Sequence, residues 1–240
     1  MAKSEITYKS LALALETSGR LGSVAIGSNN ELSDEKTFST PLRHSAELFN
    51  NTIKLLEKFG KKPNQINHVF ISIGPGSFTG IRIAVTVAKM MALAAHSQIV
   101  AVSTTDAMAL NVDDSSIKKI AAVIDAKREQ FFIAAFERKN RIWQKVLPDC
   151  MMTAQDFKKK FDKPDEPVWL LGEGLLYYAK KFETANIKIL DEKFWSPRAS
   201  NVFRIGSQMA AKGKFSDPVS LVPFYLRRPE AEENWEKKIS

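Results

Sequence analysis

Apolar runs interrupted by turn-forming residues divide the start of the chain into short strands. The first run, Leu11–Leu15, is separated by a turn at residues 17–20 from a second run, Leu21–Gly27. Asn29-Asn30 then leads into a third segment near Glu31–Phe38. Because Gly, Asn and Ser readily adopt the backbone conformations of tight turns, this pattern predicts three strands joined by hairpins.

The apolar spacing then changes to one residue in every three or four, which predicts helices. One helix is expected over Ser45–Phe59 and a second over Ser77–His96, with a strand, Val69–Ile73, between them. A short strand, Ile99–Val102, and a helix, Thr105–Leu110, complete this half of the chain.

The second half of the chain repeats the same order of elements. Three strands are expected first, over Ile120–Ile124, Phe131–Phe136 and Arg141–Leu147, followed by a helix over Thr153–Phe161. A strand over Val168–Leu171, a helix from Gly174 to Phe182, a strand over Ile187–Leu190 and a helix over Ala199–Lys212 complete the half. Two copies of a βββαβα-type order predict an α/β protein with two lobes that face each other across a cleft. The charge-rich connection Asn111–Ser116 predicts two domains, 1–110 and 111–240, the second with a charged tail.

Helix Ser45–Phe59 carries more apolar surface than docking on one sheet requires. It has two apolar stripes, one formed by Ala46, Phe49, Ile53 and Leu56 and the other by Leu48, Leu55 and Phe59. Helix Ser77–His96 is apolar almost all round and carries its long polar side chains in one narrow stripe, formed by Arg82, Thr86 and Lys89. Both helices are either central core elements or part of a subunit interface, which typically buries about 800 Å² per partner.

Composition favours a cytosolic protein. Cys150 is the only cysteine, which fits a reducing compartment, and the longest apolar stretch, Phe78–Ala95, contains Arg82 and Lys89, which argues against a membrane span. No N-terminal signal peptide is expected. The net charge of +8 is compatible with an RNA partner or with an ordinary solubilising surface, and both interpretations stay open.

The chain shows little catalytic equipment. Gly74, Gly76 and Gly80 could cradle an anion at a helix start, or they could allow tight packing with Ser77 as helix cap. The three histidines, His44, His68 and His96, are too far apart in sequence to predict a metal site, and Cys150 has no nearby base. No catalytic residue and no metal ligand are therefore assigned.

Two acids could face each other across the predicted cleft. Glu16 ends the first strand of the first half, and Asp125 ends the first strand of the second half. In an ATP-dependent phosphotransferase such acids would hold magnesium or activate water. However, the turn at residues 126–130 is bulky and charged, which tells against a phosphate chain there. The weak cofactor-binding candidates are Glu16, Gly74, Gly76 and Ser77.

Several motifs together resemble the bacterial TsaB (YeaZ) family. They are LALETSGRLGSVAIG, HSAEL, SIGPGSFTGIRIAVTVAK, VSTTDAMA, IDAKREQFFIAAF and PFYLRRPEAEENW. The resemblance runs from about residue 10 to residue 235. It implies an actin-like fold (ASKHA, a ribonuclease H-like duplication).

The resemblance also implies a function in making N6-threonylcarbamoyladenosine at position 37 of tRNAs that read codons starting with A. The chain would be a non-catalytic subunit that pairs with its paralogue TsaD, and the ATPase TsaE would join the pair. No cofactor is expected on this chain alone, since the metal is expected on TsaD and ATP on TsaE; tRNA would be contacted indirectly. When TsaD is absent, a homodimer is expected to form through the helix surface that would otherwise bind TsaD.

Mapped onto this chain, the expected interface residues are Ala46, Phe49, Ile53 and Leu56 on the first helix and Arg82, Thr86 and Lys89 on the second. The sequence leaves open which stripe of the first helix faces outward. A catalytic paralogue would carry a histidine cluster for its metal, and residues 102–108 contain none. The same absence argues against the glycoprotease label that some relatives carry. An actin-like phosphotransferase and a tRNA-binding module stay as alternatives.

Overall fold

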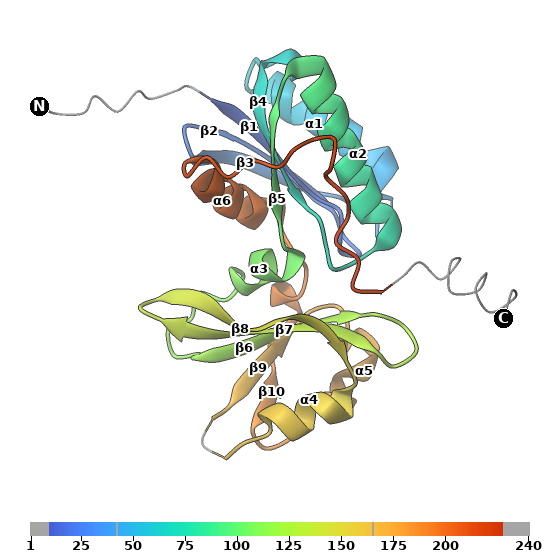
Figure 1. Ribbon diagram of the computed structural model, residues 1–240, viewed down its shortest axis with the longest axis vertical. Coiled ribbons are helices and arrows are strands. Elements are labelled where there is room, and N and C mark those ends of the chain that lie inside the picture. The colour runs from blue at the N-terminus through green and yellow to red at the C-terminus, as the bar shows by residue number, and fades with distance from the viewer. Residues whose placement is uncertain (1–9, 42, 165, 228–240) are drawn as a thin grey trace, which may run out of the picture.

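The computed structural model describes residues 10–41, 43–164 and 166–227, which form two stacked α/β lobes (Figure 1). Each lobe is built on a five-stranded sheet, with strand orders β3-β2-β1-β4-β5 and β10-β9-β6-β7-β8. This confirms the predicted α/β architecture of two lobes. The predicted charged tail lies outside the described residues.

The first lobe buries its sheet on both faces. Its strands are β1 (Leu11–Glu16), β2 (Ser23–Ser28), β3 (Glu31–Thr37), β4 (Ile66–Ser72) and β5 (Gln98–Val102). Helices α1 (His44–Lys58) and α2 (Phe78–Ala95) cover one face, and α6 (Ala199–Ala210) covers the other (Figure 1). Every residue of β1 is buried, because this strand lies at the centre of the sheet between two helical layers.

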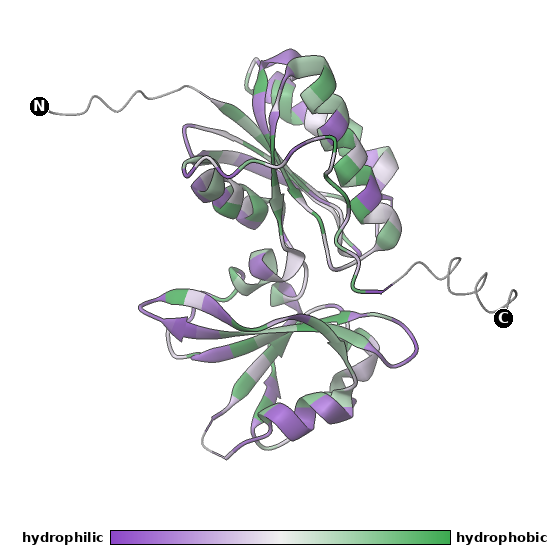
Figure 2. Cartoon of the chain, in the orientation of Figure 1, coloured by the Kyte–Doolittle hydropathy of each residue, from purple (hydrophilic) through white to green (hydrophobic). Residues whose placement is uncertain are grey.

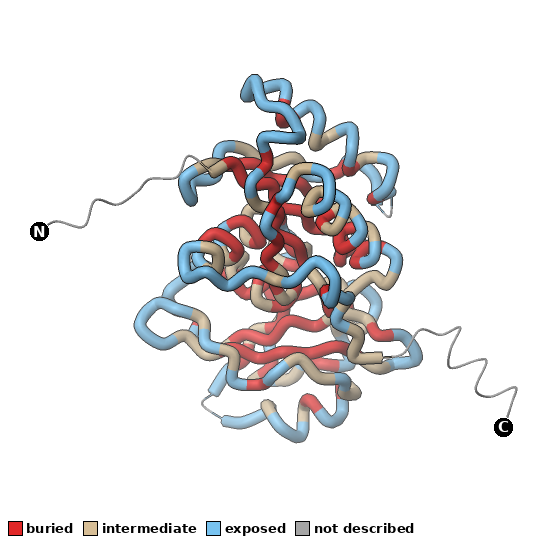
Figure 3. The backbone as a smooth tube through the Cα atoms, turned by 45° about the horizontal axis from the view of Figure 1, so that its top comes forward, coloured by how far each residue is buried: buried red, intermediate tan, exposed pale blue. Residues whose placement is uncertain are grey.

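The second lobe repeats this arrangement on a smaller scale. Its strands are β6 (Lys119–Asp125), β7 (Phe131–Lys139), β8 (Ile142–Met152), β9 (Val168–Leu171) and β10 (Ile187–Ile189). Helices α4 (Ala154–Phe161) and α5 (Leu175–Phe182) pack under the sheet, where the rings of Phe131, Phe157 and Phe182 meet edge to face. Two 3-10 turns, η1 (Pro63–Gln65) and η2 (Glu192–Phe194), connect elements. Figure 3 shows that the buried positions lie mainly along the strands.

The last helix of each half packs on the opposite lobe. Helix α3 (Thr104–Ala109) ends the first half, yet its Met108 and Ala109 belong to the core of the second lobe. Helix α6 ends the second half, yet its Val202 and Phe203 pack on the first sheet beside Phe70. The predicted domain 111–240 is therefore wrong for α6. An apolar stripe fits either sheet, so local sequence does not reveal which lobe a helix covers.

The chain after α6 continues along the first lobe. The amide of Ser216 donates a hydrogen bond to the carbonyl oxygen of Ile99 in β5, and the amide of Phe224 donates one to the carbonyl oxygen of Ile73. Between them, Leu221 is buried in the core of the first lobe. We call residues 213–227 the C-terminal segment. It runs beside α2 and ends at the junction of the lobes (Figure 1).

Helix α2 is the one helix of the described ranges that is long and apolar enough to be a candidate membrane span by length and composition. In this structure its Ile81, Ala84 and Ala88 are buried against the first sheet. This packing explains the apolar side chains on the inner side of α2, while Met90 and Leu93 on its outer side are exposed.

Candidate functional site

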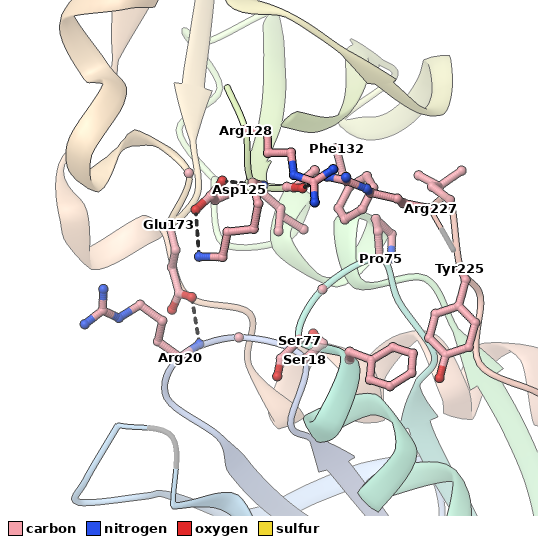
Figure 4. A pocket seen from close by; sticks show the side chains of 18 of the residues that line it. Ser18, Arg20, Pro75, Ser77, Asp125, Arg128, Phe132, Glu173, Tyr225 and Arg227 are labelled. Carbon is pink, nitrogen blue, oxygen red and sulfur yellow. Dashed lines mark hydrogen bonds and ion pairs between the residues drawn. The ribbon is translucent and has the colours of Figure 1, made fainter. Parts of the chain in front are cut away.

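A cavity of about 800 Å³ lies between the two lobes (Figure 4). Its walls come from both hairpin turns, the starts of α2 and α5, and the end of the C-terminal segment. The lining residues are Ser18, Gly19, Arg20, Pro75, Gly76, Ser77, Phe78, Ile124, Asp125, Ala126, Lys127, Arg128, Phe132, Glu173, Gly174, Tyr177, Tyr178, Phe224, Tyr225, Leu226 and Arg227. The predicted cleft is therefore present.

The glycine loop before α2 packs tightly on its neighbours. A Cβ on Gly76 would lie 2.5 Å from the carbonyl oxygen of Ser18, and one on Gly80 would overlap the carbonyl oxygen of Thr17. Gly74 has a φ of +118°, and a Cβ there would lie 2.6 Å from the carbonyl oxygen of Phe224. These contacts support the packing interpretation of the loop.

Ser77 caps α2, since its Oγ accepts from the amide of Gly80 at 3.3 Å. Of the weak cofactor-binding candidates, Gly76 and Ser77 line the cleft, whereas Gly74 and Glu16 do not.

Glu16 is fully buried beneath the hairpin turn. Its carboxylate accepts from the amide of Ser18 at 2.6 Å, from the Ser18 hydroxyl at 2.5 Å and from the Ser72 hydroxyl. Burial raises the pKa of Glu16, and the three hydrogen bonds oppose that rise. The expectation that Glu16 faces Asp125 across the cleft is wrong, because the carboxylate turns inward to bind its own hairpin.

The two carboxylates that do line the cleft are Asp125 and Glu173 (Figure 4). Asp125 accepts from the amide of Lys127 at 2.7 Å and pairs with its Nζ at 3.1 Å. Glu173 accepts from the amide of Arg20 at 2.7 Å and from the Ser196 hydroxyl at 3.0 Å, while burial raises its pKa. Glu173 thus joins the two lobes.

Sequence reasoning missed Glu173. The signal was available, because an acid between Gly172 and Gly174 follows a strand at the same place in the repeat as the glycine loop of the first half. No group of three His, Cys, Asp or Glu side chains capable of holding a metal ion occurs within residues 10–41, 43–164 and 166–227.

A second polar cluster missed by sequence reasoning joins α3 to β8. Lys145 Nζ lies 2.6 Å from Asp149 and 2.9 Å from Asp106, and Asp149 also accepts from the Thr105 hydroxyl at 2.5 Å. Because α3 follows directly from β5 of the first lobe, this cluster ties the connection between the lobes to the second sheet.

The histidines have structural positions. His44 begins α1 and is buried beside Phe38, and burial lowers its pKa. His68 stacks between the rings of Phe70 and Phe215. His96 ends α2 in a left-handed conformation, with a φ of 53°.

The two stripes of α1 face opposite ways. Leu48 and Leu55 point into the core, whereas Phe49 is 56% exposed and Ile53 is 48% exposed. Ala46 is exposed as well. Leu56, predicted on the outer stripe, is buried, because it lies at the stripe edge nearest the sheet.

The polar stripe of α2 faces the C-terminal segment. Arg82 Nε donates to the Tyr225 hydroxyl at 2.9 Å, and Lys89 Nζ donates to the carbonyl oxygen of Val219 at 3.3 Å. Thr86 between them is exposed. These intramolecular bonds were not foreseen from the sequence, which contains no short-range signal for them.

Comparison with known proteins identifies the family. The model described as "TsaD: tRNA N6-adenosine threonylcarbamoyltransferase" matches residues 39–235. The chain is 28% identical over 230 residues to the "tRNA threonylcarbamoyladenosine biosynthesis protein TsaB" of Bacillus subtilis, covering 93% of this chain and 96% of the relative. It is 25% identical over 227 residues to the protein of that name from Escherichia coli, covering 94% and 96%.

Solved structures show the same fold. The structure titled "YeaZ from Pseudomonas aeruginosa" superposes with a TM-score of 0.77 at 21% identity, covering 90% of this chain and 100% of that one. A second Pseudomonas aeruginosa structure, titled as an uncharacterized protein with similarity to peptidase YEAZ, gives a TM-score of 0.79 at 22% identity, covering 91% and 100%. The predicted actin-like fold class is confirmed. The chain belongs to the TsaD threonylcarbamoyltransferase family, and within it to the TsaB (YeaZ) group whose motifs it carries.

Proposed function

We propose that this chain is a non-catalytic subunit that pairs with a TsaD-type paralogue for the formation of N6-threonylcarbamoyladenosine at position 37 of tRNAs reading ANN codons. Its relatives are named as tRNA threonylcarbamoyladenosine biosynthesis proteins, which supports the pathway. The observation that carries the pairing is the exposure of Phe49 and Ile53 on a helix whose other stripe already fills the core. We place the protein in the cytoplasm.

The outer apolar surface spans both helices. In the strand order β3-β2-β1-β4-β5, α1 lies over β2 and β3 while α2 lies over β4 and β5, so the helices are neighbours. On α2, Met90 is 62% exposed, with Ile83 and Val87 half-buried beside it at helical spacing. We call Phe49, Ile53, Ile83, Val87 and Met90 the helical face; Figure 2 shows apolar positions along both helices.

This face has the chemistry of a protein interface. Large apolar side chains that lie together on a surface, rimmed by polar groups such as Asn50 and Thr86, are characteristic of sites of association. A pair of helices packing on another pair buries about 800 Å² on each partner, a standard size for a specific complex. The same face would serve a homodimer when the paralogue is absent.

The chemistry of the cleft supports a subunit without its own active site. Asp125 and Glu173 are already hydrogen-bonded within the chain, and Glu16 is enclosed. We therefore propose that the metal belongs to the TsaD-type partner and ATP to an associated TsaE-type ATPase. Calorimetry of this chain with Mg-ATP tests the point, because micromolar binding would instead favour an actin-like phosphotransferase.

The pairing is tested with the double variant Phe49→Glu/Ile53→Glu. Two charges on the helical face should abolish co-elution with the TsaD-type paralogue in size-exclusion chromatography, while the thermal unfolding of the monomer stays unchanged. The matched control is Ile142→Glu, which places a charge on a side chain that is 66% exposed on the other lobe. Loss of the complex with the control, or an intact complex with the double variant, would contradict the proposal.

A further inference from the structure

The cleft combines aromatic rings with an excess of basic side chains. Its aromatic lining residues are Phe78, Phe132, Tyr177, Tyr178, Phe224 and Tyr225. Its basic lining residues are Arg20, Lys127, Arg128 and Arg227, against two acids, Asp125 and Glu173. Lys127 pairs with Asp125 at 3.1 Å, and the four basic against two acidic side chains leave the lining with a net positive charge.

One wall of the cleft presents an exposed ring beside a guanidinium group. Tyr177, in the first turn of α5, is 75% exposed, and its hydroxyl lies 3.4 Å from Nη1 of Arg20 on the opposite lobe. The backbone amide of Arg20 is held by Glu173, which fixes where its side chain starts (Figure 4). A flat stacking surface and a cation are thereby placed next to each other.

The opposite wall carries a pair of stacked rings. Phe78 and Tyr225 stack with their centroids 4.9 Å apart, and the guanidinium of Arg82 lies 3.7 Å from the centre of Phe78. The hydroxyl of Tyr225 is held by Nε of Arg82. These contacts hold the two rings in position before any ligand arrives, which reduces the entropy lost on binding.

We propose that this cleft binds single-stranded RNA, with a base stacked on Tyr177 and a phosphate beside Arg20. Protein grooves that hold single strands combine basic side chains, which follow the phosphates, with aromatic rings, which stack on bases. The cavity of about 800 Å³ is large enough for a nucleotide.

This inference concerns a direct contact with RNA and goes beyond the proposed pairing function. It is tested on the full chain by fluorescence anisotropy with a short labelled, unstructured oligoribonucleotide at increasing salt. Binding should be saturable, and log K should fall by about 0.7 per phosphate contact for each tenfold increase in salt.

Two cleft variants separate stacking from charge. Tyr177→Ala should weaken RNA binding at least about fivefold with an unchanged salt slope, because stacking is not ionic. Arg20→Ala should weaken binding and reduce the slope by about 0.7. Both side chains are exposed, so thermal unfolding should match that of the unaltered protein. The matched controls are Arg204→Ala on α6 and Leu93→Ala on α2, both exposed and outside the cleft, and neither should change RNA binding.

Several results would overturn the inference. Arg204→Ala could weaken binding as much as Arg20→Ala, which would mean a diffuse charge effect. Free ATP or an acidic peptide could bind the cleft while RNA does not, which would assign it to a mononucleotide or a protein. The test is separate from the pairing test, because Phe49→Glu/Ile53→Glu should keep RNA binding and the cleft variants should keep the heterodimer.

Discussion

At the scale of single residues, the buried carboxyl of Glu16 is the most unusual group in the first lobe. It is enclosed with three hydrogen-bond donors, and burial raises its pKa above the ordinary value of 4.5. The folded protein therefore holds this proton more tightly than the unfolded chain. The contribution of Glu16 to stability is greatest below pH 4.5 and decreases as the pH rises towards the raised pKa.

Replacing Glu16 by Gln should remove that pH dependence. The free energy of unfolding of Glu16→Gln should decrease less than that of the unaltered protein between pH 4.5 and neutrality, measured by urea unfolding at each pH. Glu16→Ala is the control, because it leaves the Ser18 and Ser72 donors without an acceptor and should cost about 1–3 kcal/mol at every pH. Equal pH slopes for the Gln variant and the unaltered protein would contradict the assignment.

Gly80 is a second residue with a sharp requirement. A side chain there would overlap the carbonyl oxygen of Thr17, whose hydroxyl also donates to the carbonyl of Gly80 at 2.7 Å. Gly80→Ala should therefore destabilise the protein by about 1–3 kcal/mol, as overpacking does, despite the better helix propensity of alanine. Thermal unfolding checks this, with Gly213→Ala as a comparison at a site with open space but a positive φ. A neutral Gly80→Ala would show that the hairpin can shift.

At the scale of elements, α1 has one face for the core and one for a partner. Leu55→Ala should cost about 2–5 kcal/mol in the free energy of unfolding, because the side chain is fully buried. Ile53→Ala, two residues away and 48% exposed, should leave the stability of the monomer nearly unchanged and weaken the complex with the paralogue. Unfolding titrations and affinity measurements on both variants check this division, and a large loss of monomer stability with Ile53→Ala would contradict it.

At the scale of the whole molecule, the exchange of α3 and α6 makes each lobe depend on the other half of the chain. A fragment of residues 10–110 keeps both faces of its sheet apolar but lacks α6, so Ala12, Ala14 and Phe70 lose their cover. We expect this fragment to aggregate or stay unfolded, as judged by circular dichroism and size-exclusion chromatography.

A second fragment supplies the control. Adding residues 199–227 through a flexible linker should restore cooperative unfolding, since it returns α6 and the C-terminal segment to the first sheet. A well-folded fragment 10–110 without α6 would show that the predicted domain division is sufficient after all.

The sequence by itself determined the order and type of most elements, the two-lobed α/β fold and the family. These features rest on local apolar spacing, turn residues and contiguous motifs, all of which act over a few neighbouring positions. The outer stripe of α1 could be named but not oriented, because both stripes are equally apolar in sequence.

Only the tertiary structure decided the inward turn of Glu16, the position of Glu173 in the cleft, the burial of Leu56 and the packing of α6 on the first lobe. Each of these depends on contacts between residues far apart in the chain, such as the hydrogen bond from Arg20 to Glu173. An acid at a strand end has the same local pattern whether it faces a cleft or its own hairpin, and a helix with one apolar stripe fits any sheet of suitable width. Long-range packing alone distinguishes these outcomes.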